Sequence, residues 1–208
     1  SSDLSICRRK ILDGLKDGRV PEEVLDKAVE NVLKLVDKYV KDQPEEDFDR
    51  KAHHALAGEL VENSAVLLKN EGILPLTGNE KLLIVGDFFR NMRYQGAGSS
   101  MINPTEITSP KDAFDERGIK YEFCRGYSEN VFENVSEDVS EDNENALIEE
   151  AAKSAENADT VLVFMGLTDA AESEGFDRQD MKLPENQLRL MEALIKTGRK
   201  IAVVLFGG

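Results

Sequence analysis

The stretch Asp159-Thr-Val-Leu-Val-Phe-Met-Gly166 decides the fold of this 208-residue chain. It is a short, continuous apolar run, which is typical of a strand buried on both faces of a parallel sheet. Residues 184–196 follow with apolar side chains at helical spacing, and Lys200-Ile-Ala-Val-Val-Leu-Phe206 is a second run of the same kind. A strand, a helix and a strand in this order predict a right-handed parallel crossover.

Similar units lie upstream of this stretch. Residues 81–86 form a short apolar run that predicts a strand, followed by a helix at 109–117 and another strand at 119–123. A further helix is predicted at 143–157, before the strand at 159–165. Alternating strands and helices predict an α/β fold, in which a mostly parallel, doubly wound sheet is flanked by helices as an α/β sandwich.

The first third of the chain predicts helices only. Residues 4–15 and 21–39 carry apolar stripes, while residues 42–47 interrupt the pattern with a proline and four acidic residues and are predicted to be a linker. A third helix is predicted over residues 52–70. The stripe at 21–39 needs an apolar surface to pack against, so we expect residues 1–42 to be a helical appendage rather than a domain.

The sandwich is expected to be truncated. Gly207 and Gly208 directly follow the apolar run at 201–206, and no helix comes after it to cover that strand. A helix or sheet element normally has to bury its apolar face against another element of the same domain. We therefore expect the α/β sandwich to be incomplete at its C-terminal side.

Charge and cysteine usage exclude several functions. The net charge is −15, from 26 basic and 41 acidic residues, so nucleic acid and anionic lipid are not expected partners. No run reaches the roughly 18 apolar residues that a membrane span needs. Cys7 and Cys124 form neither a metal-ligand spacing nor a disulfide framework, which favours reduced thiols and a cytoplasmic location.

Acidic residues are concentrated in one block. Residues 129–150 hold nine Asp or Glu and no Lys or Arg. We interpret this block as a solvated loop and the exposed face of a helix start. A metal site is the alternative, but the spacing fits no calcium loop with its central glycine.

Carboxylates also follow the strand at 159–165, in the sequence Glu172-Ser-Glu-Gly-Phe-Asp-Arg178. Open α/β sheets place functional groups at the carboxyl ends of their strands. Glu172 follows Ala170 and Ala171, whose small apolar side chains would desolvate it and let it keep a proton, as a general acid requires. The alternative is an inert, solvated acidic loop.

A glycine- and serine-rich loop follows the strand at 81–86. Its core, Gly96-Ala-Gly-Ser-Ser100, lacks the Lys-Ser/Thr of a phosphate-binding loop and the third glycine of a dinucleotide fingerprint. A nucleotide cofactor is therefore not expected. The loop either lines a substrate cleft or is structural.

Three segments, in this order, resemble the family 3 glycoside hydrolases of the β-glucosidase type. They are Ala52-His-His-Ala-Leu-Ala-Gly-Glu-Leu60 running into Ser64-Ala-Val-Leu-Leu-Lys-Asn-Glu-Gly-Ile-Leu-Pro-Leu76, then Arg93-Tyr-Gln-Gly-Ala-Gly-Ser-Ser-Met-Ile-Asn-Pro104, then Glu172 to Arg178 with Met181-Lys-Leu-Pro-Glu-Asn-Gln187. The resemblance implies that residues 1–42 are the helical tail of a preceding (β/α)8 catalytic barrel. Residues 43–80 would be a linker and lead-in helix, and residues 81–208 the α/β-sandwich domain.

The resemblance also implies a retaining β-glucosidase, which releases terminal β-D-glucose with two carboxyl groups. Alignment on Asp177-Arg178 makes Glu172 the general acid/base, with Glu174 as the alternative. The nucleophilic Asp would belong to the barrel and not to this chain, so we expect the chain alone to be inactive. The implied partners are a β-glucoside or short oligosaccharide and the protein's own barrel, with no cofactor and no metal.

Further residues are candidates for the site. Arg93, Tyr94 and Phe176 are expected to contact substrate, whereas Asp177 and Arg178 are expected to shape the loop, with Arg178 pairing to Asp177 or Glu174. Ala171 stands where many relatives have an aromatic residue, and the chain has no Trp for sugar stacking. The order of strands and helices alone would also permit a non-catalytic, flavodoxin-like ligand-binding or interaction module.

Overall fold

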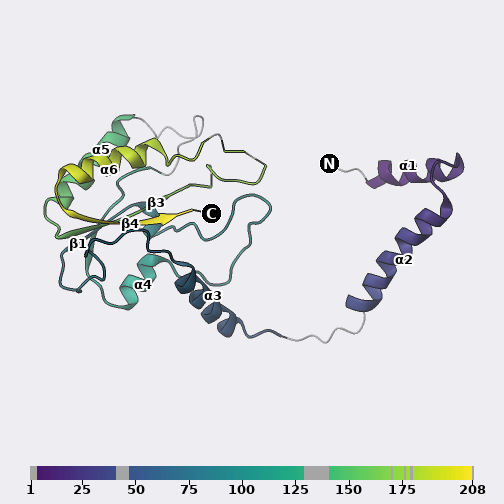
Figure 1. The fold of residues 1–208 in the computed structure, drawn as a ribbon, viewed down its shortest axis with the longest axis horizontal. Coiled ribbons are helices and arrows are strands. Elements are labelled where there is room, and N and C mark those ends of the chain that lie inside the picture. Colours follow the sequence, from purple (N-terminus) through teal and green to yellow (C-terminus); the bar gives the residue numbers. More distant parts are fainter. Residues whose placement is uncertain are drawn as a thin grey trace. The chain divides into compact units, whose positions relative to one another are not determined.

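The computed structural model describes residues 4–40, 47–128, 141–169, 171–175, 177–178 and 180–207. The chain divides into two compact units, Ser1–Leu60 and Val61–Gly208. The first unit is helical, and the second contains the sheet (Figure 1).

The helices of the first unit confirm the predicted N-terminal appendage. They are α1 (Leu4–Lys16) and α2 (Glu22–Tyr39), followed by α3 (Arg50–Ser64), which crosses the boundary between the units. A tight turn joins α1 to α2, where the Val20 amide donates to the Gly14 carbonyl oxygen at 2.9 Å. The apolar stripe of α2 is exposed within the described residues, at Val29, Val32, Leu33 and Val36.

Helix α3 is shorter than predicted. The sequence predicted a helix over residues 52–70, but α3 ends at Ser64. The Asn70 side chain accepts hydrogen bonds from the amides of Gly72 and Leu74, each at 3.1 Å, and donates to the Leu74 carbonyl at 2.7 Å. These bonds hold a local turn over residues 70–74, within the range that was predicted to be helical.

The second unit confirms the predicted α/β fold. Its four strands are β1 (Leu82–Val85), β2 (Tyr121–Cys124), β3 (Thr160–Gly166) and β4 (Lys200–Phe206). All neighbours are parallel, in the order β2-β1-β3-β4. The chain thus moves from β1 outward to β2, returns to β3 on the other side of β1, and continues outward to β4. The order reverses between β1 and β3, which is the switch point where such sheets form a crevice.

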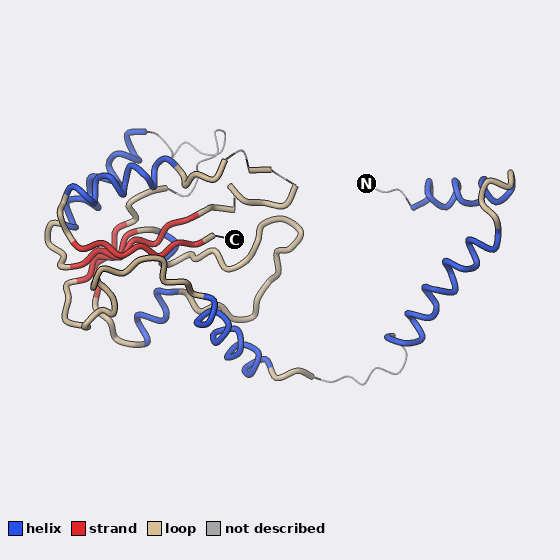
Figure 2. The backbone as a smooth tube through the Cα atoms, in the orientation of Figure 1, coloured by secondary structure: helices blue, strands red, loops and turns tan. Residues whose placement is uncertain are grey.

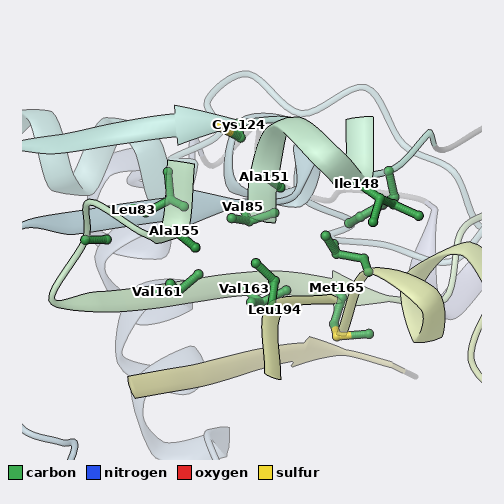
Figure 3. Close-up of a cluster of buried hydrophobic side chains, with 13 residues drawn as sticks. Leu83, Val85, Cys124, Ile148, Ala151, Ala155, Val161, Val163, Met165 and Leu194 are labelled. Atoms are coloured by element: carbon green, nitrogen blue, oxygen red, sulfur yellow. The ribbon is translucent and has the colours of Figure 1, made fainter. Parts of the chain in front are cut away.

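Helices cover both faces of this sheet. On one face, Leu83, Val85, Val161, Val163 and Met165 pack with α5 (Glu141–Ala155) and α6 (Glu185–Lys196) (Figure 3). On the other face, alternate strand residues pack with Phe88, Phe89 and the half-buried Phe114 of α4 (Pro110–Glu116). Because both faces are covered, every residue of β1 and β3 is buried, and this explains their unbroken apolar sequences.

Strand β4 forms one edge of the described sheet, and β2 forms the other. Val203, Val204 and Leu205 are exposed there, although the sequence 201–206 resembles a central strand. The expected incompleteness of the sandwich at this side stays a prediction.

No described helix combines the length and the apolar character needed to cross a lipid bilayer. The described residues also contain no group of three or more His, Cys, Asp or Glu side chains arranged to hold a metal ion.

Candidate functional site

Two loops meet at the carboxyl ends of the central strands. One follows β1 and the other follows β3, so they leave the sheet on the two sides of the switch point. A parallel bridge pairs Ala97 with Ser173, and the Glu174 amide donates to the Ala97 carbonyl at 3.3 Å. In Figure 2 long loops project from the end of the sheet at which β3 and β4 finish. The glycine-rich loop and the carboxylate loop are therefore parts of one site.

Glu172 lies in a turn just beyond β3. Its amide and that of Ala171 both donate to the Thr168 carbonyl, at 3.2 and 3.0 Å. The Glu172 side chain is 25% exposed, which places its carboxyl group at the surface of the site rather than in the packed interior.

Arg93 holds Glu172 at two points. Its guanidinium donates to the Glu172 Oε2 in an ion pair and to the Glu172 carbonyl oxygen at 3.3 Å. The Arg93 Nε lies 3.4 Å from Asp169 Oδ1. The Arg93 side chain is only 11% exposed, so this charge is largely withdrawn from water and placed between two carboxylates. Its expected contact with substrate stays a prediction.

The surroundings of Glu172 differ from the expectation in one respect. Ala171, which was expected to desolvate Glu172, is itself exposed, and Ala170 lies outside the described residues. The partly buried carboxyl group of Glu172 contacts Arg93, a residue that lies 79 positions earlier in the sequence.

Glu174 has a different environment. Its Oε2 accepts a hydrogen bond from the Ser99 amide at 2.8 Å and another from the Ser99 hydroxyl. The hydroxyl first and then the amide hold the pKa of the Glu174 carboxyl group below its usual 4.5. This carboxylate acts as an acceptor for the neighbouring loop.

Gly98 makes this approach possible. Its φ is +92°, a left-handed conformation that favours glycine. A Cβ added at Gly98 would lie 2.8 Å from the Glu174 Cβ. From its sequence, this loop was expected either to line a substrate cleft or to be structural; in the structure, Gly98 leaves room for the Glu174 side chain.

The other candidate residues are arranged as follows. Tyr94 is exposed, and its hydroxyl group lies 3.2 Å from the Gln95 Nε2, which also donates to the Ile102 carbonyl at 3.3 Å. Arg178 is exposed and donates to the Lys182 carbonyl at 3.4 Å. No ion pair from Arg178 to Asp177 or Glu174 occurs in the part of the chain that the structure describes. Phe176 lies outside the described residues.

Gln187 anchors both ends of the carboxylate loop, a role that the sequence analysis missed. Its buried side chain accepts from the Gly166 amide at 3.1 Å and donates to the Gly166 carbonyl at 2.9 Å. Gly166 ends β3 and Gln187 lies in the first turn of α6, so this pair of bonds closes the loop between them. In the sequence, Gln187 stands at a predicted helix start and ends the third segment that resembles the family.

Glu144 corrects the interpretation of the acidic block. It is buried, not solvated, and accepts from the Ser128 amide at 3.1 Å and from the Ser128 hydroxyl at 2.6 Å. The buried Asn186 side chain donates to the Ser128 carbonyl at 2.9 Å. This polar network ties the segment after β2 to the starts of α5 and α6. Residues 129–140 of the block lie outside the described residues.

A cavity of about 430 Å³ lies elsewhere and is not part of this site. It is lined by Thr77, Asn79, Glu80, Asp159, Gly198, Arg199 and Lys200. These residues precede or begin β1, β3 and β4, so the cavity opens at the amino ends of the strands, opposite Glu172.

Known proteins resemble this chain in both sequence and structure. Residues 65–208 match the glycosyl hydrolase family 3 C-terminal domain. The thermostable β-glucosidase B of Acetivibrio thermocellus is 39% identical over 98% of this chain. The exo-α-(1→6)-L-arabinopyranosidase of Bifidobacterium breve is 37% identical over 96% of it.

A solved structure agrees with these sequence relatives. The crystal structure of a family 3 β-glucosidase from Bifidobacterium adolescentis superimposes with a TM-score of 0.81, at 37% identity, over 97% of this chain and 29% of that one. The chain spans about a quarter of the length of the curated relatives, 26% and 27% respectively. The match covers most of the chain and includes the domain that carries both loops, and so the chain belongs to glycoside hydrolase family 3.

Proposed function

We propose that this chain supplies the general acid/base, Glu172, to a retaining β-glucosidase whose nucleophilic Asp lies in a barrel domain outside the chain. The observation that carries the proposal is the position of Glu172. It is a half-buried carboxyl group in the turn after β3, at the switch point of the sheet, inside the segment that resembles the acid/base loop of the family.

The proposed reaction has two steps. In the first, the protonated Glu172 gives its proton to the glycosidic oxygen while the Asp of the barrel attacks the anomeric carbon, so the aglycone leaves and a glycosyl-enzyme forms. In the second, the ionised Glu172 takes a proton from water, and the resulting attack releases the sugar and the Asp.

The barrel is also the proposed partner of the N-terminal helices. The family match begins at residue 65, whereas the relatives match 96–98% of the chain, so they share the helical part as well. The exposed apolar stripe of α2 needs a cover, because apolar residues of a helix stripe gain stability when they leave water. We propose that residues 1–42 pack on the barrel, that residues 43–80 connect it, and that residues 81–208 form the sandwich wall of the cleft.

The relatives described above support two substrate classes. The first is a β-glucoside or a short β-linked oligosaccharide, in line with the β-glucosidase relatives. The second is an L-arabinopyranoside, in line with the relative from Bifidobacterium breve. Initial rates of the longer protein on the aryl β-D-glucoside and the aryl α-L-arabinopyranoside, compared as kcat/KM, would decide between them.

Glu172→Gln in the longer protein, with its barrel, tests the role of the acid/base. For an alkyl glycoside, whose leaving group needs a proton, we expect kcat/KM to fall by roughly 10²–10⁴-fold. For a dinitrophenyl glycoside, whose leaving group needs none, kcat/KM should change little, and azide should restore the lowered kcat. Glu149→Gln, a change at an exposed position of α5, is the control. Equal behaviour of both substrates in Glu172→Gln would refute the assignment.

A further inference from the structure

The carboxylate of Glu174 fastens one functional loop to the other. It receives both the amide and the hydroxyl group of Ser99, and the backbone beside it forms the parallel bridge between Ser173 and Ala97. Ser99 and Glu174 are 75 positions apart, so this contact closes a long-range connection and not a local turn.

The chemistry of this contact does not suit a proton donor. A carboxylate that accepts two hydrogen bonds on one oxygen is stabilised in its charged form, and the lowered pKa of Glu174 agrees with this. A general acid has to hold a proton near the working pH. Glu174 therefore serves as an acceptor, although it lies only two residues from Glu172 and matches the acid/base loop almost as well by sequence.

Glu172 is held from the same glycine-rich loop. Arg93 binds its carboxyl group and its carbonyl oxygen, while Ser99 binds Glu174. Residues 172 and 174 are thus attached to positions 93 and 99 of one segment. Two attachment points on either side of Ser173 restrict both the position and the rotation of the backbone that presents Glu172.

We propose that Glu174 is a positioning residue, whose bonds to Ser99 fix the loop backbone and so set where Glu172 presents its carboxyl group to the substrate. This inference rests on the proposed function of Glu172. Since a misplacement of about 1 Å can cost roughly 10²-fold in rate, the bonds to Ser99 affect catalysis without any contact between Glu174 and the sugar.

The test uses the longer protein with its barrel and the variants Glu174→Ala, Glu174→Gln and Ser99→Ala. Glu174→Ala should lower kcat/KM for an alkyl glycoside by roughly 10- to 100-fold, and should leave kcat/KM for a dinitrophenyl glycoside within about threefold. Glu174→Gln keeps an acceptor oxygen and Ser99→Ala keeps the backbone amide donor. Each of them should therefore lower kcat/KM for the alkyl glycoside less than Glu174→Ala does. Glu149→Gln is the matched surface control.

A double variant separates positioning from an independent role. Glu172→Gln/Glu174→Ala should be no slower than Glu172→Gln, because a positioning residue has nothing left to position. In the 208-residue chain, amide hydrogen exchange of Ser99 should accelerate in Glu174→Ala, which reports the contact itself without any activity.

Each other outcome overturns the inference. Equal losses on both substrates would show a general structural role, and additive losses in the double variant would show that Glu174 acts without Glu172. A leaving-group effect and azide rescue in Glu174→Ala as large as any in Glu172→Gln would make Glu174 the acid itself. A leaving-group effect in Glu172→Gln with none in Glu174→Ala would overturn only the positioning role, whereas no effect in Glu172→Gln would overturn the proposed function.

Discussion

Replacing Gly98 by alanine should disturb the site through one defined contact. The φ of +92° costs an L-residue about 1–2 kcal/mol. In addition, the new Cβ would lie 2.8 Å from the Glu174 Cβ and 3.4 Å from the Glu174 amide nitrogen. The Glu174 Cβ is attached directly to the backbone and cannot swing aside as a side-chain tip would. The 173–174 segment therefore has to move by several tenths of an ångström or more.

Gly175→Ala provides the matched control for this change. Gly175 has a φ of +85° and lies in the same loop, but an added Cβ there would have no heavy atom within 4 Å. Both variants carry the same backbone cost, so the difference between them isolates the contact with Glu174. We expect Gly175→Ala to destabilise the domain by about 1–2 kcal/mol, and Gly98→Ala to destabilise it by more.

Two assays read out this difference. Denaturant unfolding of the 208-residue chain, followed by far-ultraviolet circular dichroism, gives the stability of each variant relative to the parent. In the longer protein, kcat/KM on an alkyl glycoside should fall roughly 10- to 100-fold for Gly98→Ala, and only a few-fold for Gly175→Ala. If both variants lose the same stability and the same activity, the contact between Gly98 and Glu174 has no role and the reasoning is refuted.

Three further predictions concern the anchor, the core and pH. Gln187→Ala removes two buried hydrogen bonds to Gly166 and should lower the free energy of unfolding by about 1–3 kcal/mol for each polar group left unpaired. Denaturant unfolding measures this loss. A loss of stability under about 1 kcal/mol would mean that water replaces the side chain. Leu83→Ala leaves a cavity at a fully buried position under α5 and should lower the free energy of unfolding by about 2–5 kcal/mol. Val66→Ala, at an exposed position, should leave the stability almost unchanged. Equal losses of stability in the two variants would contradict the assigned core. The pKa of Glu174 is lowered in the folded chain, so its contribution to stability is present above its usual value of 4.5 and is lost as the pH falls through the lower folded value. An acid titration of the Ser99 amide by NMR should show this midpoint below 4.5 and a shift upward in Ser99→Ala, and a midpoint at or above 4.5 in the parent would contradict the contact.

The fold could be predicted from the sequence because its strands are buried on both faces. Strands β1 and β3 have no solvent side, so their sequences are unbroken apolar runs, and the helices between them show their own spacing. The end of α3 could not be predicted in this way. Asn70 holds a local turn with Gly72 and Leu74 inside the range predicted to be helical, and an apolar pattern does not reveal such bonds.

The candidate site was predictable only in part. The sequence indicated both loops and the acidic residues in one of them, but it did not indicate that Arg93 reaches Glu172 or that Ser99 reaches Glu174. Such contacts depend on how the sheet brings distant segments together. Glu144 shows the same limit, because a block of acidic residues favours a solvated surface until a specific partner, Ser128, buries one of them.

The strand order explains why the two loops meet. In a sheet ordered β2-β1-β3-β4, β1 and β3 are neighbours although 74 residues lie between the end of one at Val85 and the start of the other at Thr160. The connections after them diverge to opposite sides, so their first residues remain next to each other at the carboxyl ends. The chain that follows β1 brings the positive charge of Arg93 and the glycine turn, and the chain that follows β3 brings Glu172 and Glu174. An isolated loop of the same sequence would leave Glu172 in water with no fixed direction. The topology therefore gives Glu172 a partly desolvated environment and a constrained position, which are what its proposed role in proton transfer needs. A second carboxylate facing it from another domain would complete the pair that retaining hydrolysis requires.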